Sequence, residues 1–301
     1  MFYNWCSKVW NCIVVGPTLS RHPEICYIGE PDYIWQEALG CQLNDVLLRK
    51  DATRQLKISI HKRIADLADI ENAEVILEKS PSNCFRIPFL VEVFPNAKFI
   101  HLIRDGSEVA LSASKEWSAS SSNALDSKDI RELNIYKRFI RTIIEEGEFK
   151  NRFNSFSDFK YFPLYTLKLI NFFRRQFLGN DVISWGPKFP GIRQVKKNFS
   201  LLETCAIQWE RSVLAAENAF FSLESNKVCR LYYEDFIEEP IQCLLEISDF
   251  LSLATDEETL EKISSSVVNR NTSKWESVLN LEQQNAILNQ ISFTIKRLGY
   301  N

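Results

Sequence analysis

Short apolar runs alternate with amphipathic stretches along most of the chain. Four runs rich in β-branched and aromatic residues predict strands, namely Cys12–Val15, Glu74–Leu77, Lys98–Ile103 and Val228–Tyr232. Apolar positions at helical spacing predict helices at Thr53–Ala68, Phe85–Phe94, Ser107–Trp117, Leu202–Leu223, Ile241–Leu251 and Leu281–Leu298. This alternation is typical of an α/β protein whose central sheet is mainly parallel and flanked by helices.

The middle of the chain departs from this alternation. Ser118–Ser127 is rich in serine and asparagine and predicts a loop, and Glu146–Phe177 carries many phenylalanines among charged residues. We expect a single domain over residues 1–301, with a helical insertion at about residues 128–200 that caps the sheet. The cap either lines a pocket for an acceptor or packs only on its own aromatic side chains.

Composition narrows the function classes. The chain has 301 residues, 25% of them charged, and a net charge of −3, so it has no overall basic field for nucleic acid or an anionic membrane. Eight cysteines and three histidines show no closely spaced ligand pairs, so we expect buried, reduced thiols and no metal. The N-terminal apolar stretch is too short for a signal peptide or a membrane span, which predicts a cytoplasmic protein.

The most informative chemistry follows the predicted strand Lys98–Ile103. This strand leads directly into Arg104-Asp105-Gly106, and a predicted helix opens at Ser107. A guanidinium beside the N-terminus of a helix is a natural site for a phosphate group. Ser112 lies two helical turns further on, where its hydroxyl could reach the same anion. The alternative is a structural ion pair between the arginine and the aspartate.

Several motifs in a fixed order resemble one family. They are Glu78-Lys79-Ser80-Pro81, the stretch Phe94–Asp105, Ser112, Tyr232-Tyr233-Glu234-Asp235-Phe236, and Ser273-Lys274-Trp275, with Trp209 and the loop Trp185–Gly191 in support. Together they resemble the sulfotransferases that use 3′-phosphoadenosine-5′-phosphosulfate (PAPS), in the branch of the tyrosylprotein sulfotransferases and their microbial homologues. The resemblance covers about Ser20 to the C-terminus and implies a P-loop-NTPase-like sulfotransferase fold.

The resemblance also implies roles for individual residues. Arg104 and Ser112 match the residues that hold the 3′-phosphate, and Lys79 matches a lysine near the transferred sulfuryl group. Tyr233 matches a tyrosine that contacts adenine, although a plain core position is the alternative. Ser273 and Lys274 match residues that contact the donor at the C-terminal end, and Arg270 could add charge there.

The implied reaction transfers a sulfuryl group from PAPS to a hydroxyl or amine, without a metal. An aromatic cap would suit a small molecule, a sugar, a lipid or a tyrosine-containing peptide as acceptor. The acceptor must lose a proton, so a base is required. The stretch Ser20–Trp35 resembles the family segment whose Gly-Glu turn carries that base, which points to Glu30, with Asp32 and Glu37 as substitutes.

One family element is absent. The loop that wraps the 5′-phosphosulfate, with its Arg-Ser-Gly-Thr core, is reduced to Gly16-Pro17. Residues 16–24 are also too few for a crossover between neighbouring parallel strands. Either the segment at Ile25 is not such a neighbour or the first strand is displaced. The gap favours, as an alternative function, a non-catalytic relative that binds the nucleotide. A nucleotide kinase is disfavoured, because no G-x-x-x-x-G-K-[ST] sequence is present.

Overall fold

The computed structural model describes residues 4–9, 15–40, 42–68, 73–125, 186–265, 267 and 275–300. Contacts divide the chain into two units, one of residues 1–113 and 186–301 and the other of residues 114–185. The sheet belongs to the first unit. The predicted cap, about residues 128–200, falls mainly outside the described residues and stays a prediction.

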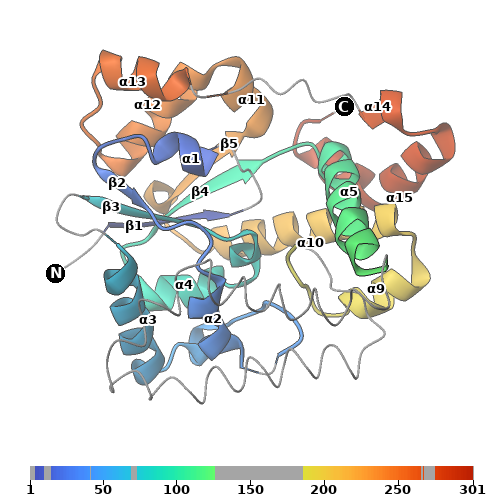
Figure 1. The fold of residues 1–301 in the computed structure, drawn as a ribbon, viewed down its shortest axis with the longest axis horizontal. Helices are drawn as coiled ribbons and strands as arrows, with labels where there is room; N and C mark the ends of the chain where they lie inside the picture. Colours follow the sequence, from blue (N-terminus) through green and yellow to red (C-terminus); the bar gives the residue numbers. More distant parts are fainter. Residues whose placement is uncertain are drawn as a thin grey trace. The chain divides into compact units, whose positions relative to one another are not determined.

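Within the described residues, five parallel strands form the sheet (Figure 1). The strands are β1 (Asn4–Val9), β2 (Ile25–Tyr27), β3 (Val75–Lys79), β4 (Lys98–Ile103) and β5 (Val228–Tyr232). Their order is β2-β3-β1-β4-β5, so β1 lies in the middle with β3 and β4 on its two sides. The expected α/β architecture with a parallel sheet is confirmed.

The predicted first strand, Cys12–Val15, is wrong. The strand is Asn4–Val9, which pairs Lys8 with Lys79 of β3 and with Ile100 of β4, whereas Val15 begins the short helix α1 (Val15–Leu19). β2 pairs with β3 and not with β1. The segment at Ile25 is therefore not a neighbour of the first strand, and the first strand is also displaced towards the N-terminus. The fifteen residues 10–24 that now separate β1 from β2 are enough for a crossover between parallel strands.

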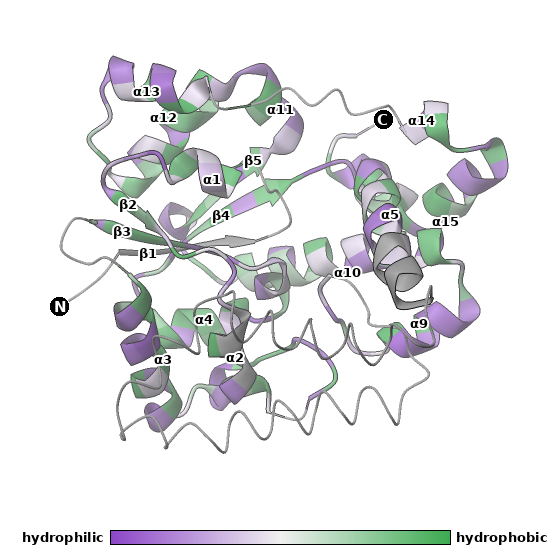
Figure 2. Ribbon diagram, viewed as in Figure 1, coloured by the Kyte–Doolittle hydropathy of each residue, from purple (hydrophilic) through white to green (hydrophobic). Residues whose placement is uncertain are grey.

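Helices cover both faces of the sheet (Figure 1). On one face lie α1, α11 (Tyr233–Glu238), α12 (Pro240–Leu251) and α13 (Glu257–Ser264), which share one apolar core with the strands. On the other lie α3 (Arg54–Leu67), α4 (Ile87–Val93) and α10 (Leu201–Phe220). Apolar residues predominate on β2, β3, β4 and β5, whereas the helices alternate between apolar and polar residues (Figure 2).

The remaining described helices are α2 (Asp32–Leu39), α5 (Gly106–Leu125), α9 (Ile192–Asn198), α14 (Trp275–Val278) and α15 (Leu281–Arg297). Short 3₁₀ turns occupy Arg49–Asp51, Pro81–Phe85 and Ser225–Lys227. The prediction of a loop at Ser118–Ser127 is wrong in large part, because α5 continues to Leu125. Serine is only mildly unfavourable inside a helix, and neither proline nor glycine interrupts this stretch.

Capping explains where several predicted helices begin. Thr53 accepts a hydrogen bond from the Leu56 N–H at the start of α3, and Ser200 with Glu203 forms a capping box at the start of α10. Such caps satisfy backbone donors that have no partner within the helix. No described helix is both long and apolar enough to cross a membrane.

The cysteines whose side chains the structure describes are Cys26, Cys84, Cys205, Cys229 and Cys243, and these five are free thiols. Burial raises the pKa of the Cys84, Cys205 and Cys229 thiols to about 12. Thiols with raised pKa carry little thiolate and react slowly. These side chains therefore act as small apolar core residues.

Replacing Ser7 by proline tests the position of β1. Proline removes a ladder hydrogen bond from a strand that is paired on both sides, so we expect the free energy of unfolding to fall by about 3 kcal/mol or more. Leu281→Pro is the control, because Leu281 is exposed at the first position of α15, where proline is tolerated. Equal urea midpoints for the two variants would contradict a central β1.

Candidate functional site

The order of the strands locates the site. The chain builds β3 on one side of β1 and then crosses to build β4 on the other side. Ligands of open α/β sheets bind beyond the carboxyl ends of the strands at such a switch point. Lys79 ends β3 and Arg104 directly follows β4, so two predicted site residues lie at this edge of the sheet.

The structure brings Lys79 and Glu30 together. The Lys79 side chain is only 3% exposed and its ammonium forms an ion pair with the Glu30 carboxylate, which is 45% exposed. Backbone hydrogen bonds fix this contact, because the Ile28 N–H donates to Leu77 and the Lys79 N–H donates to Gly29. Gly29 has a φ of +70°, a turn geometry that favours glycine. Glu30, the predicted base, thus forms an ion pair with Lys79, the lysine predicted to lie near the sulfuryl group.

The two substitute bases are placed differently. The Glu37 carboxylate on α2 lies 2.8 Å from the Arg63 guanidinium on α3 and accepts a hydrogen bond from the Ser59 hydroxyl. It therefore joins two helices. Asp32 begins α2, and its side chain lies outside what the structure describes. Among the described carboxylates of this segment, Glu30 is the one that forms an ion pair with Lys79.

A buried carboxylate supports the turn after Lys79. Glu78 is fully buried and accepts hydrogen bonds from the Ser80 hydroxyl and the Asn83 amide, each 2.5 Å long. These two hydrogen bonds join the end of β3 to the 3₁₀ turn that follows it. The sequence motif identified the Glu78–Pro81 turn but gave no sign of Asn83, which lies in the 3₁₀ turn that follows.

Asp105 does not serve as the ion-pair partner of Arg104. Its carboxylate accepts hydrogen bonds from the backbone N–H groups of Ser107 (2.7 Å) and Glu108 (3.2 Å), and so caps α5. Burial raises the pKa of this carboxyl group, and the two backbone bonds oppose that rise. Arg104 pairs instead with Glu108. The sequence alternative of a structural ion pair between Arg104 and Asp105 is therefore wrong, because the partner of Arg104 is Glu108.

Two distant helices hold the Arg104 turn. Glu234 on α11 accepts a hydrogen bond from the Asp105 N–H (3.1 Å) through one oxygen and from the Tyr300 hydroxyl (2.7 Å) through the other. Trp209 on α10 donates its indole N–H to the Arg104 carbonyl (3.2 Å). The turn is therefore fixed before any ligand arrives. The sequence showed Glu234 and Trp209 as parts of motifs, without these contacts.

The Arg104 side chain lies between a carboxylate and an aromatic ring. One guanidinium nitrogen is 3.7 Å from the Glu108 carboxylate, and the guanidinium carbon is 4.6 Å from the centre of the Tyr233 ring. Tyr233 is 7% exposed and belongs to the core. It is thus a core residue that also contacts Arg104, and its contact with adenine stays a prediction.

The other predicted donor-binding residues are partly described. Ser112 is exposed on α5, one turn beyond Glu108, so the two side chains share a face of the helix. Arg270, Ser273 and Lys274 lie outside the described residues. The next described residue, Trp275, donates its backbone N–H to the Glu108 carboxylate at 2.7 Å. This hydrogen bond joins Trp275 to α5.

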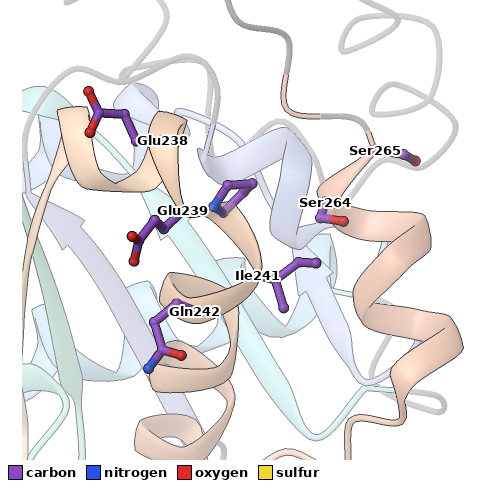
Figure 3. A pocket seen from close by; sticks show the side chains of 7 residues that line it. Glu238, Glu239, Ile241, Gln242, Ser264 and Ser265 are labelled. Carbon is purple, nitrogen blue, oxygen red and sulfur yellow. The ribbon is translucent and has the colours of Figure 1, made fainter.

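An open hollow with a cavity volume of about 480 Å³ lies at the junction of α11, α12 and α13 (Figure 3). Its lining comprises Glu238, Glu239, Pro240, Ile241, Gln242, Ser264 and Ser265. This lining has two carboxylates and no basic group, so it opposes the binding of an anion. Among the described residues, no group of three acidic, histidine or cysteine side chains is arranged to hold a metal ion.

The model of the sulfotransferase family matches residues 36–155, the stretch that contains Lys79, Arg104 and Ser112. The resemblance to the sulfotransferases is confirmed over this stretch. No curated protein matches the chain in sequence.

Solved structures with a similar chain path are also sulfotransferases. The sulfotransferase domain from the curacin biosynthetic pathway has a TM-score of 0.49 at 13% identity, covering 100% of this chain and 99% of that one. A sulfotransferase from Alicyclobacillus acidocaldarius has a TM-score of 0.46 at 13% identity, covering 100% and 97%. Mouse sulfotransferase SULT7A1, complexed with PAP, has a TM-score of 0.45 at 11% identity, covering 97% and 84%.

Replacing Gly106 by alanine tests the support of the Arg104 turn. A Cβ atom at this position would lie 2.6 Å from the Trp209 ring, so we expect the free energy of unfolding to fall by about 1–3 kcal/mol. Lys115→Ala is the control, because Lys115 is exposed on the same helix, where a substitution changes stability by about 0.5 kcal/mol or less. Equal stability of the two variants would show that Trp209 does not pack against this turn.

Proposed function

We propose that the chain, whose residues 36–155 match the model of the sulfotransferase family, transfers a sulfuryl group from PAPS to a hydroxyl or amine of an acceptor. The acceptor is a small molecule, a sugar, a lipid or a tyrosine-containing peptide. We place the reaction in the cytoplasm, which the free thiols support, since reducing compartments keep cysteines unpaired.

The spacing of the two cations is the observation that carries this proposal. Lys79 is level with Ile100 of β4, because both pair with Lys8 of β1. Arg104 is four residues further along the chain, so the two backbones are separated by about 13 Å along the strands and about 10 Å across them. A ligand that reaches both cations needs two well-separated anionic groups. PAPS has them in its 3′-phosphate and its 5′-phosphosulfate.

The contacts of Lys79 and Glu30 suit the chemistry. An acceptor oxygen forms a bond to sulfur, the bond from sulfur to the bridging oxygen breaks, and 3′-phosphoadenosine-5′-phosphate (PAP) leaves with the electron pair. The Lys79 ammonium is suited to stabilise the charge that develops on the bridging oxygen. Glu30 takes the proton of the acceptor, after its hydrogen bond with the ammonium has been exchanged for one with the acceptor.

A second function is favoured by one specific observation. Between β1 and α1 the sequence reads Trp10-Asn11-Cys12-Ile13-Val14, without glycine, serine or a basic residue. This stretch resembles no phosphate-binding loop, whose backbone N–H groups supply a large electrostatic stabilisation. The absence of such a loop is consistent with a non-catalytic relative that binds the nucleotide at Arg104 and transfers the sulfuryl group inefficiently. The ion pair of Lys79 with Glu30 supports transfer instead.

Removal of the Arg104 guanidinium tests the nucleotide site. Because charged hydrogen bonds contribute about 1.5–3 kcal/mol, we expect Arg104→Ala to weaken the binding of PAP by about 10- to 150-fold in calorimetry. Arg54→Ala is the control, since Arg54 is exposed on α3 and its loss changes the net charge equally. Equal affinities of Arg104→Ala and the unchanged protein would remove Arg104 from the site.

Replacing Glu30 by glutamine separates transfer from binding. If Glu30 is the base, turnover with labelled PAPS and a panel of phenols, sugars and amines should fall by about 10²- to 10⁴-fold, while PAP affinity stays nearly constant. Glu37→Gln is the control and should retain turnover, because Glu37 joins α2 to α3. Full turnover in Glu30→Gln would exclude Glu30 as the base. No turnover in the unchanged protein, with PAP binding retained, would favour the non-catalytic alternative.

A further inference from the structure

Glu108 occupies a position between two parts of the proposed nucleotide site. One carboxylate oxygen (Oε2) lies 3.7 Å from the Arg104 guanidinium, and the other (Oε1) accepts a hydrogen bond from the Trp275 N–H at 2.7 Å. The carboxylate is 16% exposed. A single side chain on α5 therefore contacts the predicted 3′-phosphate residue and the end of the C-terminal donor-binding segment.

The two contacts differ in kind. A charge-assisted hydrogen bond from nitrogen to oxygen is about 2.7–2.9 Å long, so the distance of 3.7 Å between Glu108 and Arg104 is an ion pair without a short hydrogen bond. Glu108 neutralises the guanidinium but leaves its donors open to another acceptor. The contact with Trp275, in contrast, is a direct hydrogen bond to the backbone.

We propose that Glu108 sets the affinity and the pH dependence of the Arg104 site for the 3′-phosphate of the nucleotide. This inference rests on the proposed function, because it takes Arg104 as the ligand of a phosphate group. A phosphate bound to Arg104 lies close to the Glu108 carboxylate, and two negative groups at that distance repel each other. The ionised carboxylate therefore weakens phosphate binding, and its neutral form does not.

The bond to Trp275 gives Glu108 a second, opposite effect. Arg270, Ser273 and Lys274 precede Trp275 closely in the sequence, and the resemblance implies that they contact the donor. Glu108 holds the backbone of Trp275, the residue that follows Lys274 in the sequence. Loss of the charge should strengthen nucleotide binding, whereas loss of the hydrogen-bond acceptor should weaken it. The two effects are separable by substitution.

The charges around Glu108 define the sign of the pH dependence. Burial raises the pKa of the Glu108 carboxyl group above its usual value, the Trp275 N–H and Arg104 oppose that rise, and Asp105 and Glu276 add to it. As pH rises through this pKa, the carboxyl group ionises and the affinity for a phosphate should fall. A phosphate group also titrates, so the comparison must be made against a variant that binds the same nucleotide without this carboxyl group.

Glu108→Gln provides that variant. The glutamine carbonyl can still accept the Trp275 N–H, whereas the charge is lost, so we expect calorimetry at neutral pH to show PAP bound about tenfold more tightly. Glu108→Ala loses the acceptor as well, and its affinity should lie below that of Glu108→Gln. Glu116→Gln is the matched control, because Glu116 is exposed two turns further along α5, and it should bind PAP as the unchanged protein does.

The pH profile completes the test. The ratio of PAP affinities between Glu108→Gln and the unchanged protein should shrink as pH falls towards the pKa of Glu108, because the phosphate titrates equally in both. Measuring Arg104→Ala in the same experiment distinguishes a failure of this inference from a failure of the proposed function. If it weakens PAP binding but Glu108→Gln binds no more tightly than the unchanged protein, this inference is overturned and the proposed function stands. If the unchanged protein binds no PAP, both are overturned.

Discussion

The crossing of the chain from β3 to β4, past β1, is the constraint on which the site depends. β1 pairs in parallel with both neighbours, so the chain leaves β3 and β4 at the same edge of the sheet. Lys79 ends the first of these strands, and Arg104 follows the second. Neither residue is close to the other in sequence, and their spacing is set by backbone pairing instead of by any direct contact. The proposed donor, with its two anionic ends, therefore has to match a spacing that the sheet sets.

Each of these cations is already paired with a carboxylate of the chain. Lys79 is buried and pairs with Glu30, and Arg104 pairs with Glu108 while it stacks on Tyr233. A buried charge without a partner costs several kcal/mol, so these pairs let the cations persist before a ligand arrives. The same pairs must be exchanged or screened when an anion binds. In the proposed site, the two carboxylates therefore compete with an anionic ligand for the cations, which residue types alone do not reveal.

The sequence predicted some elements well for identifiable reasons. Lys98–Ile103 and Val228–Tyr232 have the bounds expected, because each is a compact, mainly apolar run followed within three residues by the start of a helix. The first strand was assigned to Cys12–Val15 because that run is more apolar than Asn4–Val9. Pairing with β3 and β4, a contact between residues far apart in sequence, decides in favour of Asn4–Val9. The i, i+4 spacing of Arg104 and Glu108 was visible in the sequence and could have predicted their ion pair. The hydrogen bonds of Glu234 with Asp105 and Tyr300 join distant segments and had no local signal.

The displaced first strand also changes the meaning of the absent phosphate loop. Gly16 was interpreted as a remnant of that loop, but it lies within α1, where a Cβ atom would be 2.9 Å from the Tyr27 ring. Gly16 is therefore a packing residue that lets α1 approach β2. In the family that the sequence resembles, this loop follows the first strand, so its place in this chain is between the end of β1 at Val9 and the start of α1 at Val15. The chain provides no glycine or basic residue there, so the proposed reaction needs another source of stabilisation for the 5′-phosphosulfate. Among the described side chains, Lys79 is the cation at the end of β3, the neighbour of β1. In the proposed reaction, the stabilisation of the leaving group therefore rests on one ammonium whose resting partner is Glu30.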